Sequence, residues 1–262
     1  MRFVFLLLIP IFLAGCQKVI SINLNSTEKK YIVSGRITDQ PGECQVSITQ
    51  SKDFSENNQF PGVSGATVTI ESDGVVTTLP ETTAGIYSDA SFTGQPGRTY
   101  SLKIQVGGET FSSTSTMPQP VNLDSIYVST ARLSNTKYVT VIYKDPLNIA
   151  NYYHFIQYIN GKKEPTIFVS DDEFTDGQTV KSQLEYNNDT DDTTRDIKKG
   201  DSVSIDMICN DAAVYKFWYS LSNGATGANE SASPANPVSN ISGGAVGYFS
   251  AQTIQRKSVL VN

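Results

Sequence analysis

The side chains best suited to chemistry in this sequence gather in two acidic clusters. The first comprises Asp171, Asp172, Glu173 and Asp176, and the second comprises Asp189, Asp191, Asp192 and Asp196. Carboxylates are hard oxygen ligands of the kind that calcium takes, so the first cluster is a candidate calcium site. Neither cluster has the D-x-[DN]-x-[DN]-G spacing with a distal Glu that marks a calcium loop. Solvated loops are therefore the favoured interpretation. Glycoside hydrolysis by paired carboxylates depends on their separation in space, which the sequence does not give.

His154 is the single histidine, so any mechanism that needs an imidazole would have to use it. It lies in NYYHFIQYI, among aromatic residues on a predicted core strand. This setting favours a hydrogen-bonded structural histidine over a base or a metal ligand. The sequence contains no G-x-S-x-G, no H-E-x-x-H and no P-loop motif. We therefore expect no catalytic residues, no enzymatic activity and no cofactor other than the candidate calcium ion.

Cys16 ends an apolar run near the start of the chain. Arg2 precedes the apolar stretch 3–13, which is shorter than the roughly 20 residues that a membrane-spanning helix needs. A charged start, a short apolar centre and small residues predict a secretory signal. Leu13-Ala14-Gly15-Cys16 resembles the lipobox of bacterial lipoproteins. This resemblance implies cleavage between Gly15 and Cys16 and an acyl anchor on Cys16 that holds the protein to a membrane. The alternative is a cysteine buried in a short apolar segment.

The composition limits the partners. The formal net charge is −6 and the sequence pI is ≈ 4.9, which argues against a nucleic-acid partner and against electrostatic adhesion to anionic lipid. No run after the signal approaches membrane-spanning length, so we expect a soluble, tethered body. Charged residues make up only 18% of the chain, and Gly and Tyr are frequent. Such a composition is typical of β-structure with turn-rich loops.

Cys44 and Cys209 are the remaining cysteines, and both lie in predicted strands. A disulfide between them is possible in an oxidising compartment. Such a bond would join distant parts of the chain, and the sequence cannot show that they are close enough. Two separate buried thiols that act as small hydrophobic residues are the favoured interpretation.

The pattern of strands and turns predicts an all-β protein of two domains. Short alternating runs separated by Gly, Pro and Asp turns fill residues 31–117, with a hairpin over 31–51. This half resembles Ig-like or prealbumin-like β-sandwich modules. Met117-Pro118-Gln119-Pro120 marks a break. The predicted divisions are a signal peptide at 1–15, a tether at 16–29, the Ig-like sandwich at 30–118 and a second β-rich, sandwich-like domain at 119–262.

The second half is predicted to contain further strands and one short α-helix. Residues 212–223 place apolar side chains at i, i+3, i+4 and i+7, after a capping Asn210-Asp211 and before Gly224. A polar loop over 225–240 follows, and a final strand pair is expected to end the chain. The polar loops at 54–63 and 223–240 are candidate ligand loops, since sandwich loops present ligands.

The C-terminal segment 236–251, NPVSNISGGAVGYFSA, is the most distinctive stretch. It resembles a family of Bacteroidota lipoproteins that carry domain of unknown function 4249. CQKVISINL, YIVSGRIT, GATVTI, DDEFTDGQ and the Lys199-Gly200-Asp201 turn agree with that resemblance. Physically, Gly243, Gly244 and Gly247 predict close backbone approach or positive φ, with Tyr248 and Phe249 filling space. We favour a packing role for this segment over a role as a ligand-binding loop.

The family resemblance implies an outer-membrane lipoprotein with no known reaction. It also implies a partner, because such proteins are often encoded beside TonB-dependent outer-membrane transporters. The leading hypothesis is an accessory or substrate-capture protein of such a transporter, on either face of the outer membrane. The alternative is a structural or adhesin-like envelope protein without small-molecule cargo.

Overall fold

The structure, a computed structural model, describes residues 29–52, 59–131, 136–186, 195–225 and 236–262. The first half contains β1 Tyr31–Thr38, β2 Cys44–Gln50, β3 Thr67–Ser72, β4 Val75–Leu79, β5 Glu81–Thr83, β6 Ile86–Asp89, β7 Thr99–Val106 and β8 Glu109–Thr116. The second half contains β9 Leu123–Thr130, β10 Lys137–Lys144, β11 Tyr152–Ile159, β12 Lys162–Lys163, β13 Phe168–Asp171, β14 Thr179–Leu184, β15 Ser202–Asn210, α1 Ala212–Ala225 and β16 Val246–Leu260. The predicted all-β fold with one helix is confirmed. Gly15, Cys16 and the signal peptide predicted at 1–15 lie outside the described residues.

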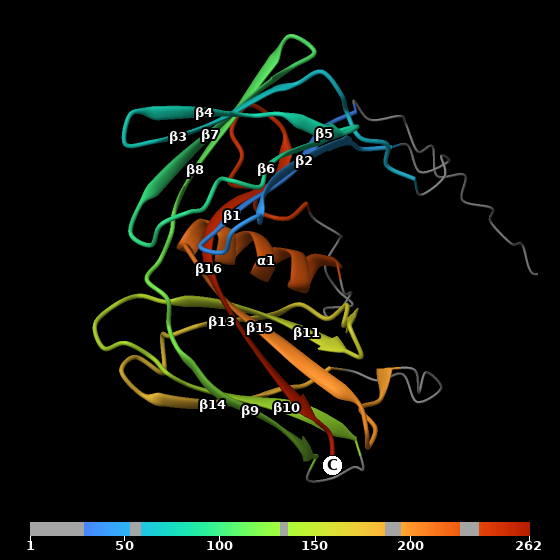
Figure 1. Ribbon diagram of the computed structural model, residues 1–262, viewed down its shortest axis with the longest axis vertical. Helices are drawn as coiled ribbons and strands as arrows, with labels where there is room; N and C mark the ends of the chain where they lie inside the picture. Colours follow the sequence, from blue (N-terminus) through green and yellow to red (C-terminus); the bar gives the residue numbers. More distant parts are fainter. Residues whose placement is uncertain (1–28, 53–58, 132–135, 187–194, 226–235) are drawn as a thin grey trace, which may run out of the picture.

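The first half is a β-sandwich. One layer is the four-stranded sheet β4-β3-β7-β8, and the other consists of β1, β2, β6 and β5, which belong to a larger sheet. Their alternating residues enclose one hydrophobic core. The predicted hairpin over 31–51 is the antiparallel β1–β2 pair, in which Gly35 faces Val46. Figure 1 shows these layers in the upper part of the molecule.

The second half is also built from two packed sheets. The three-stranded sheet β14-β10-β9 faces β11 and β15, and β13 pairs with β11. A second, aromatic-rich core lies between them and includes Tyr143, Tyr153 and Phe155. Residues 172–178 form the turn that carries the chain from β13 to β14.

Strand β16 belongs to both halves. Residues 246–252 pair in parallel with β1, and residues 253–260 pair antiparallel with β15. Phe249 and Ala251 lie in the first core, whereas Val259 and Val261 pack in the second. The strand pair predicted at the C-terminus was therefore wrong: one 15-residue strand runs through both sandwiches (Figure 1).

The segment before β16 also returns to the first sandwich. The Ser113 hydroxyl donates a hydrogen bond to the Asn240 carbonyl (2.8 Å), and Ile241 lies in the first core. The Asn240 side chain pairs with the backbone of Phe249 in both directions. The chain crosses from β8 to β9 at 117–122, where the domain boundary is predicted, yet residues 239–252 complete the first sandwich.

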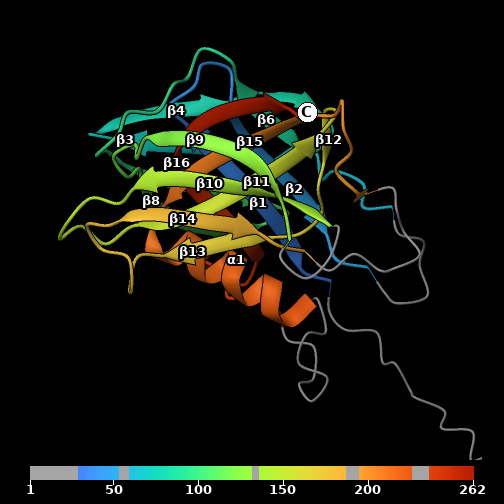
Figure 2. The same cartoon turned by 90° about the horizontal axis from the view of Figure 1, so that it is seen from below.

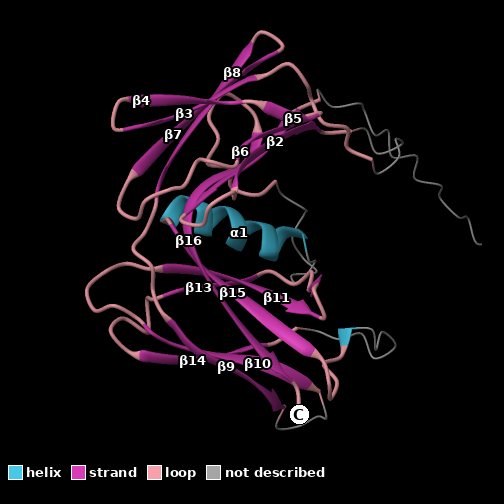
Figure 3. Ribbon diagram, viewed as in Figure 1, coloured by secondary structure: helices cyan, strands magenta, loops and turns pink. Residues whose placement is uncertain are grey.

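Helix α1 is capped as the sequence predicts. The Asp211 carboxylate accepts the backbone N–H of Val214 (2.9 Å), one of the donors left free at a helix N-terminus. The same carboxylate accepts the Ser115 hydroxyl and so ties the helix start to β8. Figures 2 and 3 show α1 against the sheets, close to β13 and β16. Within the described residues, no helix is both long and apolar enough to cross a bilayer.

Candidate functional site

The acidic segment 171–176 lies beside the loop that connects β10 to β11. We call residues 145–151 and 171–178 together the acidic double loop. Asp172 and Asp176, both predicted as site residues, lie near Asp145, and ligand oxygens of the three carboxylates are within 4.8 Å of one another. Asp145 is fully buried. The sequence analysis missed it because Asp145 lies 27 positions before Asp172 in the chain and nothing local marks it.

These carboxylates join the two loops. Asp176 accepts the backbone N–H of Asn148 (2.7 Å), and Asp172 accepts that of Asn151 (2.8 Å). Asp145 accepts the Tyr153 hydroxyl and, through its other oxygen, the backbone N–H of Gly177 (3.3 Å). Burial raises the pKa of Asp145, and the neighbouring Asp172 and Asp176 raise it further, while the two donors oppose the shift.

Asp171 and Glu173, the other two predicted ligands, do not join this cluster. Asp171 accepts the Tyr215 hydroxyl of α1 (3.0 Å), and Glu173 is exposed. Burial raises the pKa of Tyr215, and its hydrogen bond to Asp171 adds to the shift. This contact fixes the start of the turn against the helix.

Calcium takes six to eight oxygen ligands. Four of the six oxygens of Asp145, Asp172 and Asp176 already accept protein N–H or O–H groups. The contacts favour a cross-link between two loops over a metal site, and calcium binding stays a prediction. Asp196 of the second cluster lies in the described chain, whereas Asp189, Asp191 and Asp192 lie outside it.

His154 is buried on β11 beneath α1. Its ring lies 4.6 Å from that of Trp218, and the side chain is 5% exposed. Burial, and secondarily the charge of Lys163, lowers the pKa of His154 to about 3. The imidazole is therefore neutral at physiological pH, inside the contact between helix and sheet.

The two described cysteines are free and buried. Cys44 lies in the first core and Cys209 in the second, so no bridge between them forms in the structure. Burial raises the pKa of Cys44 to about 12, with a further contribution from Asp89, and burial also raises the pKa of Cys209. Both thiols are therefore poor nucleophiles.

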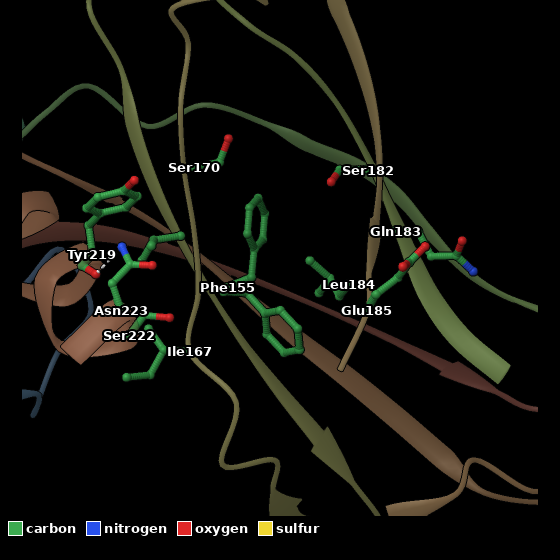
Figure 4. A pocket seen from close by; sticks show the side chains of 12 residues that line it. Phe155, Ile167, Ser170, Ser182, Gln183, Leu184, Glu185, Tyr219, Ser222 and Asn223 are labelled. Atoms are coloured by element: carbon green, nitrogen blue, oxygen red, sulfur yellow. Dashed lines mark hydrogen bonds between the residues drawn. The ribbon is translucent and has the colours of Figure 1, made fainter. Parts of the chain in front are cut away.

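A cleft opens between β13, β14 and the last turns of α1 (Figure 4). Its volume is ≈ 360 Å³, within the usual range of small-molecule sites. The lining residues are Phe155, Ile167, Phe168, Val169, Ser170, Ser182, Gln183, Leu184, Glu185, Tyr219, Ser222 and Asn223. In Figure 4 the side chains of α1 and those of β14 lie on opposite sides of Phe155. The cleft thus combines an apolar floor with a polar rim.

Tyr219 gives this cleft an exposed aromatic face. Its side chain is 53% exposed, and its ring lies 5.6 Å from that of Tyr215. Tyr215 in turn stands 5.2 Å from Tyr152 of β11. The row of three rings leads from the sheet into the cleft and holds Tyr219 in place.

A second cleft of ≈ 430 Å³ lies where β16 changes partners, and both halves line it. Its Arg256 pairs with the buried Asp206 (Nη2 to Oδ2, 2.6 Å) and lies 5.1 Å from the ring of Tyr158. Arg36 and Glu43 from the first half complete the charged lining, 3.8 Å apart. These four charged side chains form two ion pairs, so none of them offers an uncompensated charge to a ligand.

The described residues define an all-β protein of two sandwiches that share the strand β16. A family model described as a domain of unknown function (DUF4249) matches residues 17–258. The chain therefore belongs to the DUF4249 family. A comparison with curated proteins found no match.

Proposed function

We propose that this protein is a lipid-anchored accessory protein of the outer membrane that captures a substrate for a TonB-dependent transporter. The observation that carries the proposal is the cleft of Figure 4, where the exposed Tyr219 lies to one side of an apolar floor with a polar rim. A cleft of this kind fits a small molecule. The lipobox resemblance at Cys16 supports the anchor, and the resemblance to Bacteroidota lipoproteins supports the transporter as partner.

The proposed role is binding rather than catalysis. His154 is buried and neutral, and both described thiols have raised pKa values. The buried carboxylate of Asp145 is engaged by Tyr153 and Gly177. These groups are occupied in packing and loop cross-linking, which supports a non-enzymatic function.

The partner is tested by a mild-detergent pull-down of the native lipoprotein, tagged after Asn262, followed by mass spectrometry. We expect a stoichiometric TonB-dependent transporter with the wild type and its loss with Cys16→Ala, which cannot be acylated. Recovery of the protein alone, across several detergents and growth conditions, would favour the structural or adhesin-like alternative.

The cargo is tested separately. The purified lipoprotein is heat-denatured, and the small molecules that it releases are identified by mass spectrometry. We expect a compound that is lost in Tyr219→Ala and kept in Val76→Ala, a matched control whose side chain is 63% exposed on β4. Equal release from both variants would exclude the cleft as the cargo site.

A further inference from the structure

The acidic double loop carries three large apolar side chains that face solvent. Phe174 is 83% exposed, Leu147 66% and Ile149 55%. A single exposed apolar side chain is ordinary, but three on two adjoining loops form a patch of the kind that marks an interaction site.

Hydrogen bonds fix the backbones of the two loops that carry these side chains. Besides the carboxylate contacts, the Asp145 N–H donates to the Gln178 carbonyl (2.9 Å). Gly177 has a φ of 69°, and a Cβ there would lie 2.7 Å from Cδ1 of Leu147, so Leu147 packs directly on its backbone. Loop backbones that are ordered before binding lose little conformational entropy when a partner covers them.

The charge around the patch limits what can cover it. The double loop contains five carboxylates, namely Asp145, Asp171, Asp172, Glu173 and Asp176, and no Lys, Arg or His. Glu173 and Asp176 are exposed beside the apolar side chains. An anionic lipid surface repels such a rim, whereas a protein surface with Lys and Arg complements it.

We propose that the acidic double loop docks a second envelope protein, with Phe174, Leu147 and Ile149 seated in an apolar recess bordered by Lys and Arg. The inference rests on the proposed function only in placing the partner in the envelope. It does not depend on cargo in the cleft or on the partner being a transporter.

The test uses the full-length lipoprotein in its native cells, with a photo-reactive phenylalanine analogue at position 174. The same analogue at position 76 is the matched control, because Val76 on β4 is also exposed and apolar. We expect a protein adduct at position 174 at about tenfold the yield at position 76, as a buried anchor should give. Sequencing of the adduct should place the cross-link at an apolar residue of the partner with Lys or Arg nearby.

Two variants separate docking from chance contact. In the position-174 protein, Ile149→Ser should lower the yield about tenfold by removing an apolar contact. Glu173→Lys should lower it about fivefold by reversing the rim charge. Both residues are exposed, and unchanged melting curves will confirm that the variants fold.

Four results would overturn the inference: an adduct to lipid, an adduct between two copies of this chain, equal yields at positions 174 and 76, or a yield that neither variant changes. A partner that meets every criterion but is not a transporter would support the docking surface and refute the transporter in the proposed function.

Discussion

The two sandwiches differ in what they bury. The buried polar side chains of the first include Thr38, Ser113 and Ser115, all neutral. The second sandwich holds the buried carboxylates of the described chain, which are Asp145, Glu164, Asp172 and Asp206. Each has a partner: Tyr153, Arg195, the Asn151 backbone and Arg256, respectively.

Buried charges cost desolvation free energy that pairing offsets only with good geometry. Buried charge pairs therefore add little to the free energy of unfolding and are better suited to fixing a particular arrangement of loops and clefts. The cleft of Figure 4 and the acidic double loop both lie in the second sandwich. The two binding surfaces that we propose therefore both lie in the half that buries charged side chains.

The largest loss of stability is expected from a substitution in β16, the strand that the two sandwiches share. Gly247 has a φ of 130°, and a Cβ there would lie 1.8 Å from the Val33 carbonyl oxygen. We expect Gly247→Ala to lower the free energy of unfolding by about 4 kcal/mol, measured by urea denaturation. Gly244→Ala is the matched control, because Gly244 has a φ of 96° and open space around it. It should cost about 1 kcal/mol.

Alkylation of the thiols would show which core the Gly247 variant opens. We expect Cys44, in the first core, to react before Cys209, in the second. Simultaneous reaction would mean that the two sandwiches unfold as one unit and would weaken their comparison as separate parts.

The next effect concerns the cross-link of the double loop. Asp145→Ala leaves the Tyr153 hydroxyl and the Gly177 N–H without their acceptor. We expect a loss of about 3 kcal/mol in the free energy of unfolding. Glu173→Ala, at an exposed position of the same loop, should change it by less than about 0.5 kcal/mol. Equal effects would show that the cross-link does not stabilise the loops.

The buried His154, which lies under α1, should make the free energy of unfolding depend on pH. Its folded pKa is lowered to about 3 and its unfolded pKa is about 6.5, so the unfolded state binds the proton first. The contribution of the neutral His154 to the free energy of unfolding is present above pH 6.5 and is lost as the pH falls toward 3. Relative to His154→Phe, the wild type should lose about 2 kcal/mol between about pH 7 and pH 5. Parallel stability curves for the two proteins would contradict the buried, neutral imidazole.

The smallest effect is expected from calcium. A site with a Kd near 10⁻⁴ M would stabilise the protein by about 2 kcal/mol at about 5 mM calcium. Because the double-loop carboxylates already accept protein hydrogen bonds, we expect no measurable shift in Tm with calcium or with magnesium as the control. A shift with calcium alone that Asp176→Asn removes would establish the site.

The features that depend on residues close together in the sequence were predicted. β1, β2, β7 and β8 alternate clearly, the Asp211 cap precedes an amphipathic helix, and the glycines before β16 have the expected positive φ. What depends on distant contacts was not predicted. Asp145 meets Asp172 only through the fold, and nothing within β16 shows that its partner changes at residue 253. Phe174 and Ile149 read as ordinary loop residues until the structure places their loops together.

The shared strand also sets an order of events during biosynthesis. Residues 31–116 emerge early, but the β1 edge that β16 covers stays unpaired until residues 246–252 have been made. Until then, the first sandwich exposes a strand edge and part of its core, a state prone to aggregation. A chain truncated before residue 246 would keep that edge exposed permanently and should therefore aggregate more readily than the full-length chain.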